Sequence, residues 1–177
     1  MGQLNYEGQL YFNEIKRRLP DIIIQEKIDE LREATKGYIV GHVNSYDGHI
    51  ESYNQKNPFA MLTAAISSNE YIDIQKELGE IGYEKFKFEF FVSSPYLESY
   101  KFRILFFEYG ISGYPVKVVI EQGIIDEIVG DNSNYIVEIN SEVDFNNLLD
   151  GILKSKRMIT IMQDMINATN TIGKIEG

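Results

Sequence analysis

Cysteine is absent from this chain of 177 residues, and histidine and proline are scarce, at two and four. Without a thiol the chain has no disulfide scaffold, no cysteine nucleophile and no cysteine-ligated metal or iron–sulfur site. With two histidines, the chain has few imidazole side chains that could act in acid–base catalysis or bind a metal ion. The sequence also lacks a linker, a low-complexity tract and an internal repeat, so we expect one domain over residues 1–170 and a frayed tail at 171–177.

Long apolar runs and excess basic charge are missing as well. No run approaches the roughly 18 apolar residues that a membrane span requires, and residues 1–10 do not resemble a signal peptide. The net charge is −10, which disfavours binding to nucleic-acid phosphates and to anionic membranes. We therefore expect a cytoplasmic protein that binds neither nucleic acid nor membrane and attracts basic partners.

Basic side chains are wholly absent from residues 118–153, although this segment carries eight carboxylates. They are either ordinary solvated residues, some of them at the positive end of a helix, or a surface for a basic partner. An EF-hand frame beginning at Asp131 would place Tyr135 and Ile136 at positions that need a better ligand and a glycine, so calcium is not predicted. The eight are Glu121, Asp126, Glu127, Asp131, Glu138, Glu142, Asp144 and Asp150.

Helical spacing of apolar residues appears in the N-terminal, central and C-terminal parts of the chain. The first such segment ends at Pro20, and the next precedes Gly37, which is suited to a helix C-terminus. Central helices are predicted over Asn57–Gly79. Near the C-terminus, Ser141 and Ser155 are predicted N-caps. The helix after Ser155 is predicted to bury Ile159, Met162 and Ile166.

Strand patterns fill the region between the helices. Residues 37–54 predict a hairpin with Asp47-Gly48 at its turn. Four later segments alternate or are β-rich, and short loops join them, which is typical of an antiparallel meander. The sequence therefore predicts an α+β fold, with helices packed on an antiparallel sheet of about five to six strands. The later strand segments are 85–92, 101–109, 114–121 and 135–139.

The predicted hairpin has one apolar face and one face rich in tyrosine and polar residues. Ile39, Val43 and Ile50 would face the core. His42 and His49 would share the other face, but they lie roughly 13 Å apart along the ladder, too far to bind one metal ion. Tyrosine-rich polar faces are typical of binding surfaces as well as of solvated sheets. The other face carries Tyr38, Val40, His42, Asn44, Tyr46, His49, Glu51 and Tyr53.

No catalytic or cofactor motif is recognisable. The chain has no G-x-S-x-G elbow, no P-loop and no G-x-G-x-x-G fingerprint. Ser93 and Ser94 follow a strand, but a serine triad has few ways to form with two histidines. We therefore assign no catalytic residue, no metal ligand and no cofactor.

The composition favours a non-enzymatic acidic module that binds a basic protein, such as an immunity- or inhibitor-type neutraliser in a bacterium or phage. One alternative is an enzyme or ligand-binding protein with a pocket between the sheet and the helices of Asn57–Gly79. Another is a homo-oligomeric structural or phage-morphogenesis protein. The residues predicted to bind the partner are Tyr38, His42, Tyr46, His49, Glu51, Tyr53, Glu121, Asp126, Glu127 and Asp131.

Overall fold

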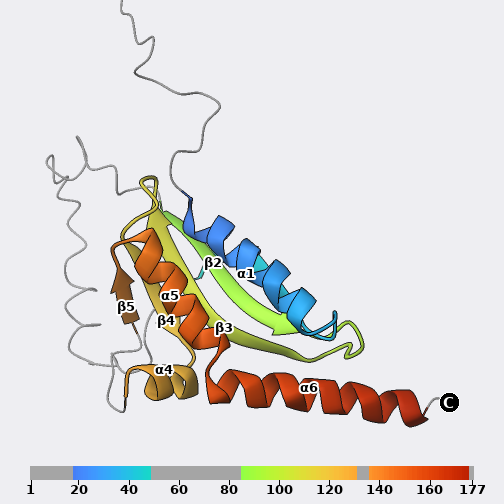
Figure 1. Ribbon diagram of the computed structural model, residues 1–177. Coiled ribbons are helices and arrows are strands. Elements are labelled where there is room, and N and C mark those ends of the chain that lie inside the picture. The colour runs from blue at the N-terminus through green and yellow to red at the C-terminus, as the bar shows by residue number, and fades with distance from the viewer. Residues whose placement is uncertain (1–17, 49–84, 131–135, 176–177) are drawn as a thin grey trace, which may run out of the picture.

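The structure, a computed structural model, describes residues 18–48, 85–130 and 136–175 (Figure 1). Within these ranges one antiparallel sheet has the strand order β1-β2-β3-β4-β5, so each strand pairs with its neighbours in sequence. The order confirms the predicted meander. The strands are β1 (Val40–Ser45), β2 (Lys85–Ser93), β3 (Lys101–Gly110), β4 (Val116–Ile120) and β5 (Ile136–Ile139).

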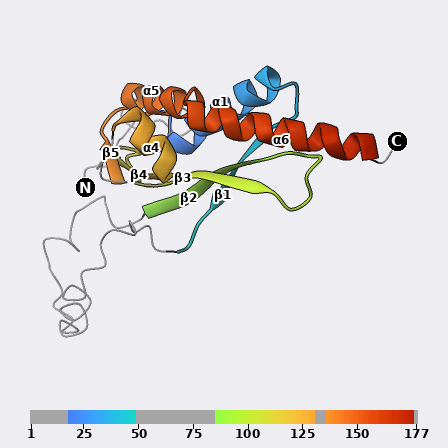
Figure 2. The same ribbon diagram turned by 90° about the horizontal axis from the view of Figure 1, so that it is seen from below.

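Helices α1 and α5 lie next to each other over one face of this sheet, and Figure 2 shows the helices gathered on that side. Helix α6 packs on α4 and α5 and then continues past them (Figure 1). An antiparallel sheet with helices on one face is an α+β fold, as predicted. The helices of the described ranges are α1 (Pro20–Ala34), α4 (Gln122–Ile128), α5 (Glu142–Leu153) and α6 (Lys156–Ile175).

The hydrophobic core lies between the sheet and the layer of α1 and α5. Alternate side chains of a strand point to opposite faces, so the helix-facing set of each strand is apolar. Phe90 of β2 and Phe107 of β3 are fully buried in this layer. Phe107 packs on Phe145 of α5, with ring centroids 6.3 Å apart, while Ile24 of α1 belongs to the same buried cluster. The strand faces predicted from the alternation are therefore observed.

Helix α1 begins at Pro20, which occupies the first helical turn. Proline fits there because that turn has no intrahelical partner for its N–H, so Pro20 starts this helix. Residues 4–17 of the preceding predicted helix lie outside the described ranges. The helix ends at Ala34 with Thr35 as its C-cap, and Lys36 and Gly37 follow with positive φ angles of 52° and 78°. Gly37 thus reverses the chain two residues beyond the cap.

Strand β1 is the first half of the predicted hairpin. Its partner in the described part of the chain is β2, with Val43 opposite Phe90. The ladder continues beyond the strand, since the N–H of Tyr46 donates to the carbonyl of Lys87 at 2.9 Å. The predicted second strand, residues 49–54, and the central helices of Asn57–Gly79 lie outside the described residues.

Both C-terminal helices have the predicted serine caps. The hydroxyl of Ser141 accepts from the N–H of Asp144, and that of Ser155 accepts from the N–H of Met158, each at 3.1 Å. The buried stripe of α6 differs in part from the prediction. Met158, Ile161 and Met165 are buried, and the predicted Met162 and Ile166 are partly buried against the same core, whereas the predicted Ile159 is 52% exposed. The helix also extends to Ile175, five residues past the predicted boundary at Asn170.

Candidate functional site

The outward face of β1 carries two of the predicted binding residues. A side chain at Gly41 would meet Ile28 of α1, so odd-numbered residues of β1 face the helices. His42 and, beyond the strand end, Tyr46 belong to the opposite set, as the sequence predicts. Their predicted companions His49, Glu51 and Tyr53 lie outside the described residues, as does one wall of the alternative pocket against Asn57–Gly79.

The aromatic and charged side chains on this outward face contact one another. His42 stacks on Phe91 with ring centroids 4.9 Å apart, and Tyr46 packs on Phe106 at 4.6 Å. The guanidinium of Arg103 lies over Phe106, 4.9 Å from its centroid, and pairs with Glu89 at 2.7 Å. These contacts hold the aromatic side chains in place, and Glu89 is buried beneath them.

His42 and Ser93 form the one side-chain pair here that resembles a base and its nucleophile. Nε2 of His42 lies 2.8 Å from the hydroxyl of Ser93, a distance that would allow proton transfer. Ser93 sits opposite Val40 in the ladder of β1 and β2. The bond is a cross-strand hydrogen bond between β1 and the last residue of β2.

Two of the predicted acidic residues tie α4 to α6. Glu121 caps α4 by accepting from the N–H of Ile124 at 3.0 Å, and it pairs with Arg157 at 3.3 Å. Glu127 accepts from the backbone N–H groups of Lys156 and Arg157 at 2.6 and 2.9 Å. These bonds lower the pKa of Glu127, with that from Arg157 contributing most. The carboxylate satisfies the exposed N-terminus of α6.

Two further carboxylates of the base-free segment find cations on α1 and just before it. Glu142 pairs with Arg18 at 2.6 Å. Asp150 pairs with Lys27 at 2.9 Å and with Lys154 at 3.2 Å. The Lys27 ammonium, more than that of Lys154, lowers the pKa of Asp150. Arg18 and Lys27 thus supply cations that the base-free segment lacks. The pairs Glu142–Arg18 and Asp150–Lys27 join α5 to the N-terminal region.

The outer surface of α1 and α5 remains acidic after this pairing. Asp126 lies half-buried on α4, apart from this surface, and Asp131 lies outside the described residues. The two helices contain two basic side chains, Lys27 and Arg32, and Lys27 is buried. Asp29 and Glu33 are exposed one turn apart on α1. Seven carboxylates of this surface, the acidic layer, are Glu26, Asp29, Glu30, Glu33, Glu142, Asp144 and Asp150.

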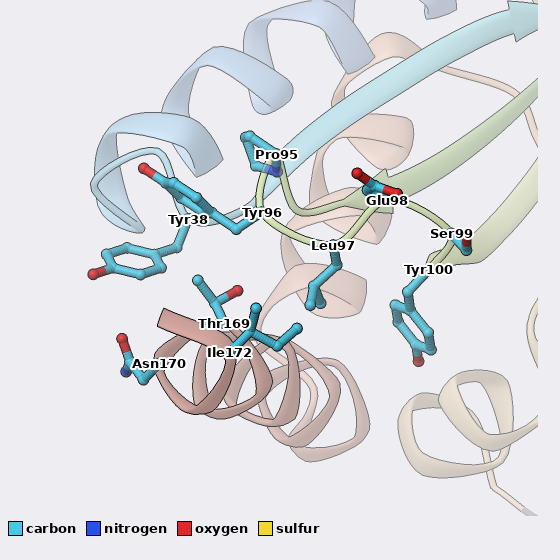
Figure 3. Close-up of a pocket in the computed structure, with 10 residues that line it drawn as sticks. All are labelled: Tyr38, Pro95, Tyr96, Leu97, Glu98, Ser99, Tyr100, Thr169, Asn170 and Ile172. Atoms are coloured by element: carbon cyan, nitrogen blue, oxygen red, sulfur yellow. The ribbon is translucent and has the colours of Figure 1, made fainter. Parts of the chain in front are cut away.

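An open groove of 1380 Å³ lies between the loop that joins β2 to β3 and the C-terminal half of α6 (Figure 3). Thr169 and Ile172 point from α6 toward Leu97 of the loop (Figure 3). Tyr38 enters from the turn after α1 and packs on Tyr96 at 5.7 Å. Glu98 is the one charged residue of a lining that otherwise mixes apolar, aromatic and neutral polar side chains, so the groove suits binding in which charge contributes little. The lining is Tyr38, Pro95, Tyr96, Leu97, Glu98, Ser99, Tyr100, Thr169, Asn170 and Ile172.

Of the predicted partner-binding residues that the structure describes, Tyr38 alone lies in this groove. The loop residues Tyr96 and Tyr100 were not predicted, because the loop has no periodic pattern and its proximity to α6 is set by the tertiary fold. Three exposed or half-buried tyrosines around one groove are typical of protein-binding surfaces. The groove and the acidic layer are therefore separate surfaces of different chemistry.

No group of three or more acidic or histidine side chains that could hold a metal ion occurs among residues 18–48, 85–130 and 136–175. Among the described residues, the largest pKa shift is that of Tyr109. Burial raises this pKa most, followed by the hydrogen bond from the Tyr109 hydroxyl to Asp21 at 2.7 Å. This pair joins β3 to α1 in the core and is structural. In the same ranges, no helix has the length and apolar character needed to cross a membrane.

Comparison of the chain with protein-family models, with curated proteins and with solved structures finds no significant match.

Proposed function

We propose that this protein is a non-enzymatic module that binds a basic protein through the acidic layer on α1 and α5. The observation that carries the proposal is that seven carboxylates on these two adjacent helices face one exposed basic side chain within them and two beside them, Arg18 and Lys154. In its most specific form the module neutralises a basic, nuclease-like target in the cytoplasm of a bacterium or phage-infected cell, as an immunity protein or inhibitor does.

The acidic layer suits this role because part of it is not used inside the molecule. Arg18 and Lys27 engage Glu26, Glu30, Glu142 and Asp150. Asp29 and Glu33, in contrast, are exposed on the solvent side of α1. A net charge of −10 also attracts basic partners from a distance, which accelerates association more than it strengthens the final complex.

The predicted surface around α4 is a weaker basis for the proposal. Glu121 and Glu127 both hold the start of α6, and their use by a partner would compete with these bonds. Contacts to Tyr38, His42 or Tyr46 would belong to a second contact region of the partner, because Tyr38 lines the groove and His42 and Tyr46 lie on the sheet face opposite the helices. The main electrostatic contribution is assigned to α1.

The test compares three baits in lysate of the source organism at low salt, with a salt step and mass spectrometry. The first bait is the wild type. The second carries Asp29→Asn and Glu33→Gln, which remove two charges from the acidic layer. The third carries Glu138→Gln and Asp164→Asn, which remove the same charge from exposed positions elsewhere.

The expected result is one basic protein that the wild type and the Glu138/Asp164 variant retain and that salt releases. Its recovery on the Asp29/Glu33 variant should fall about three- to tenfold, since electrostatic attraction depends on charges near the contact. Equal recovery on all three baits would mean that the acidic layer is not the binding surface.

A further inference from the structure

The C-terminal half of α6 extends beyond the body that its N-terminal half packs on. The helix has 20 residues and is therefore about 30 Å long. Met158, Ile161 and Met165 are buried in its first half. Farther along, a side-chain hydrogen bond reaches the loop between β2 and β3, where the hydroxyl oxygens of Ser94 and Thr169 lie 3.3 Å apart. Figure 1 shows the end of α6 projecting past the other elements.

The apolar stripe of α6 continues into this projecting half. Met158, Ile161, Met165, Ala168 and Ile172 follow one another at alternating spacings of three and four residues, which is the a/d pattern of helices that pair with another helix. The stripe is buried as far as Met165, while Ala168 is exposed and Ile172 is 41% exposed. The apolar stripe of α6 therefore extends beyond the part of the helix that the rest of the chain covers.

The composition of the projecting half does not favour a free-standing helix. Thr169, Asn170, Thr171 and Gly173 are all weak helix formers, and most helices in proteins gain their stability from packing rather than from propensity. Here the packing surface on one side is the groove, which is open. A second body that filled the groove would supply the missing contacts along this half of the helix.

The groove and the C-terminal half of α6 carry few charged residues, unlike the acidic layer, and this scarcity indicates which partner can bind there. Between Arg157 and Lys174, Asp164 is the only charged residue, and Glu98 is the only charged residue that lines the groove. A basic partner has little to recognise there and is drawn to the acidic layer instead. Two copies of a chain with charge −10 repel each other, so they can approach only where charge is sparse. Interface centres are likewise poor in charge and rich in tyrosine.

We propose that two copies of this chain form a symmetric dimer in which their grooves close on each other and their α6 helices run antiparallel. In such an interface the same patch serves both copies. Ile172 and Thr169 of each copy then cover the tyrosines of the partner's groove. This association leaves the acidic layer available and does not depend on the function proposed above.

Light scattering coupled to size exclusion measures the mass directly, over a concentration series and at low and high salt. The expected mass is twice 20.4 kDa for the wild type, retained at high salt because the contact holds little charge. Ile172→Asp should weaken association about a hundredfold or more, since it places a charge in the contact. Val143→Asp adds the same charge on α5, at a site 67% exposed, and should leave the dimer intact.

Two further measurements keep the test decisive. Tyr96→Ser alters the groove from a loop without touching α6, and it should also shift the mass toward the monomer.

The chain has no cysteine, so Thr171→Cys gives a single attachment site for a spin label on the exposed side of α6. A dipolar distance between two labels is expected. A monomer at every concentration, or a dimer that both groove variants leave intact while circular dichroism shows them folded, would overturn the proposal.

Discussion

The ion pair between Lys27 and Asp150 is the contact through which the base-free segment is joined to α1, and its removal has a calculable effect. The Lys27 side chain is 10% exposed and that of Asp150 is 37% exposed, with 2.9 Å between Nζ and the carboxylate. Exposed pairs contribute about 0.2–1 kcal/mol, whereas breaking a fully buried pair costs about 3–5 kcal/mol. Because water screens Asp150, we expect a coupling free energy of about 1 kcal/mol, near the lower of these ranges.

A double-mutant cycle measures this coupling without the other contacts of either residue. Asp150→Asn removes one charge at constant shape, and Lys27→Met removes the other while keeping the apolar stem that α1 buries. Urea unfolding followed by circular dichroism gives the free energy of each variant. A coupling below about 0.3 kcal/mol would show that the pair does not stabilise the contact between α1 and α5.

The same pair predicts how the coupling depends on pH. The pKa of Asp150 is lowered in the fold, chiefly by the hydrogen bond from Lys27. Its stabilisation is therefore present above the unfolded pKa of about 3.9 and is lost as pH falls through the folded value. The pKa of Lys27 is raised, chiefly by Asp150, so the stabilisation is also lost at strongly alkaline pH. The coupling should accordingly be constant near neutrality and shrink below about pH 4.

Three further outcomes test the packing and the chemistry of the described residues. Gly41→Ala should destabilise the fold by about 1–3 kcal/mol in urea, because its Cβ would lie 2.5 Å from Ile28 of α1. Ser155→Ala should cost about 1 kcal/mol in the same assay, since the N–H of Met158 loses its cap. A fluorophosphonate probe should leave Ser93 unlabelled in mass spectrometry. Labelling at that serine would contradict the structural role given to its bond with His42.

Features that depend on a few adjacent residues were predictable from the sequence. Ser141 and Ser155 cap α5 and α6 because the bond to a backbone N–H three residues later is local. The alternation of apolar and polar residues likewise predicted the strands. The less regular pattern of β3 reflects a register shift opposite Phe90 and Phe91. Helix α4 was not predicted, because its seven residues span too few turns to show a period.

The stripe of α6 shows how a local pattern can mislead. Ile159, Met162 and Ile166 follow helical spacing as well as Met158, Ile161 and Met165 do. The two sets are offset by one residue, or about 100° around the helix. Tertiary contacts with α4 and α5 bury the second set, while Met162 and Ile166 are only partly buried against the core and Ile159 is exposed. The sequence alone does not contain these contacts.

The surfaces were the least predictable part, since they join distant segments. Glu142 meets Arg18 across 124 positions, so the base-free segment gave no indication of its cations. The acidic layer likewise required the neighbouring placement of α1 and α5. The groove combines Tyr38, the loop around Leu97 and the end of α6 around Ile172, three segments with no common pattern.

The central claim, that a basic partner is steered to the acidic layer, is tested most directly by the association rate constant of the captured partner. Stopped-flow mixing at about 10 mM and about 500 mM salt spans screening lengths from about 30 Å to a few ångströms. The wild-type rate constant should fall about tenfold or more between these conditions. The Asp29→Asn/Glu33→Gln variant should show a weaker dependence and the Glu138→Gln/Asp164→Asn variant a wild-type one. A wild-type rate constant that is the same at both salt concentrations would contradict the claim.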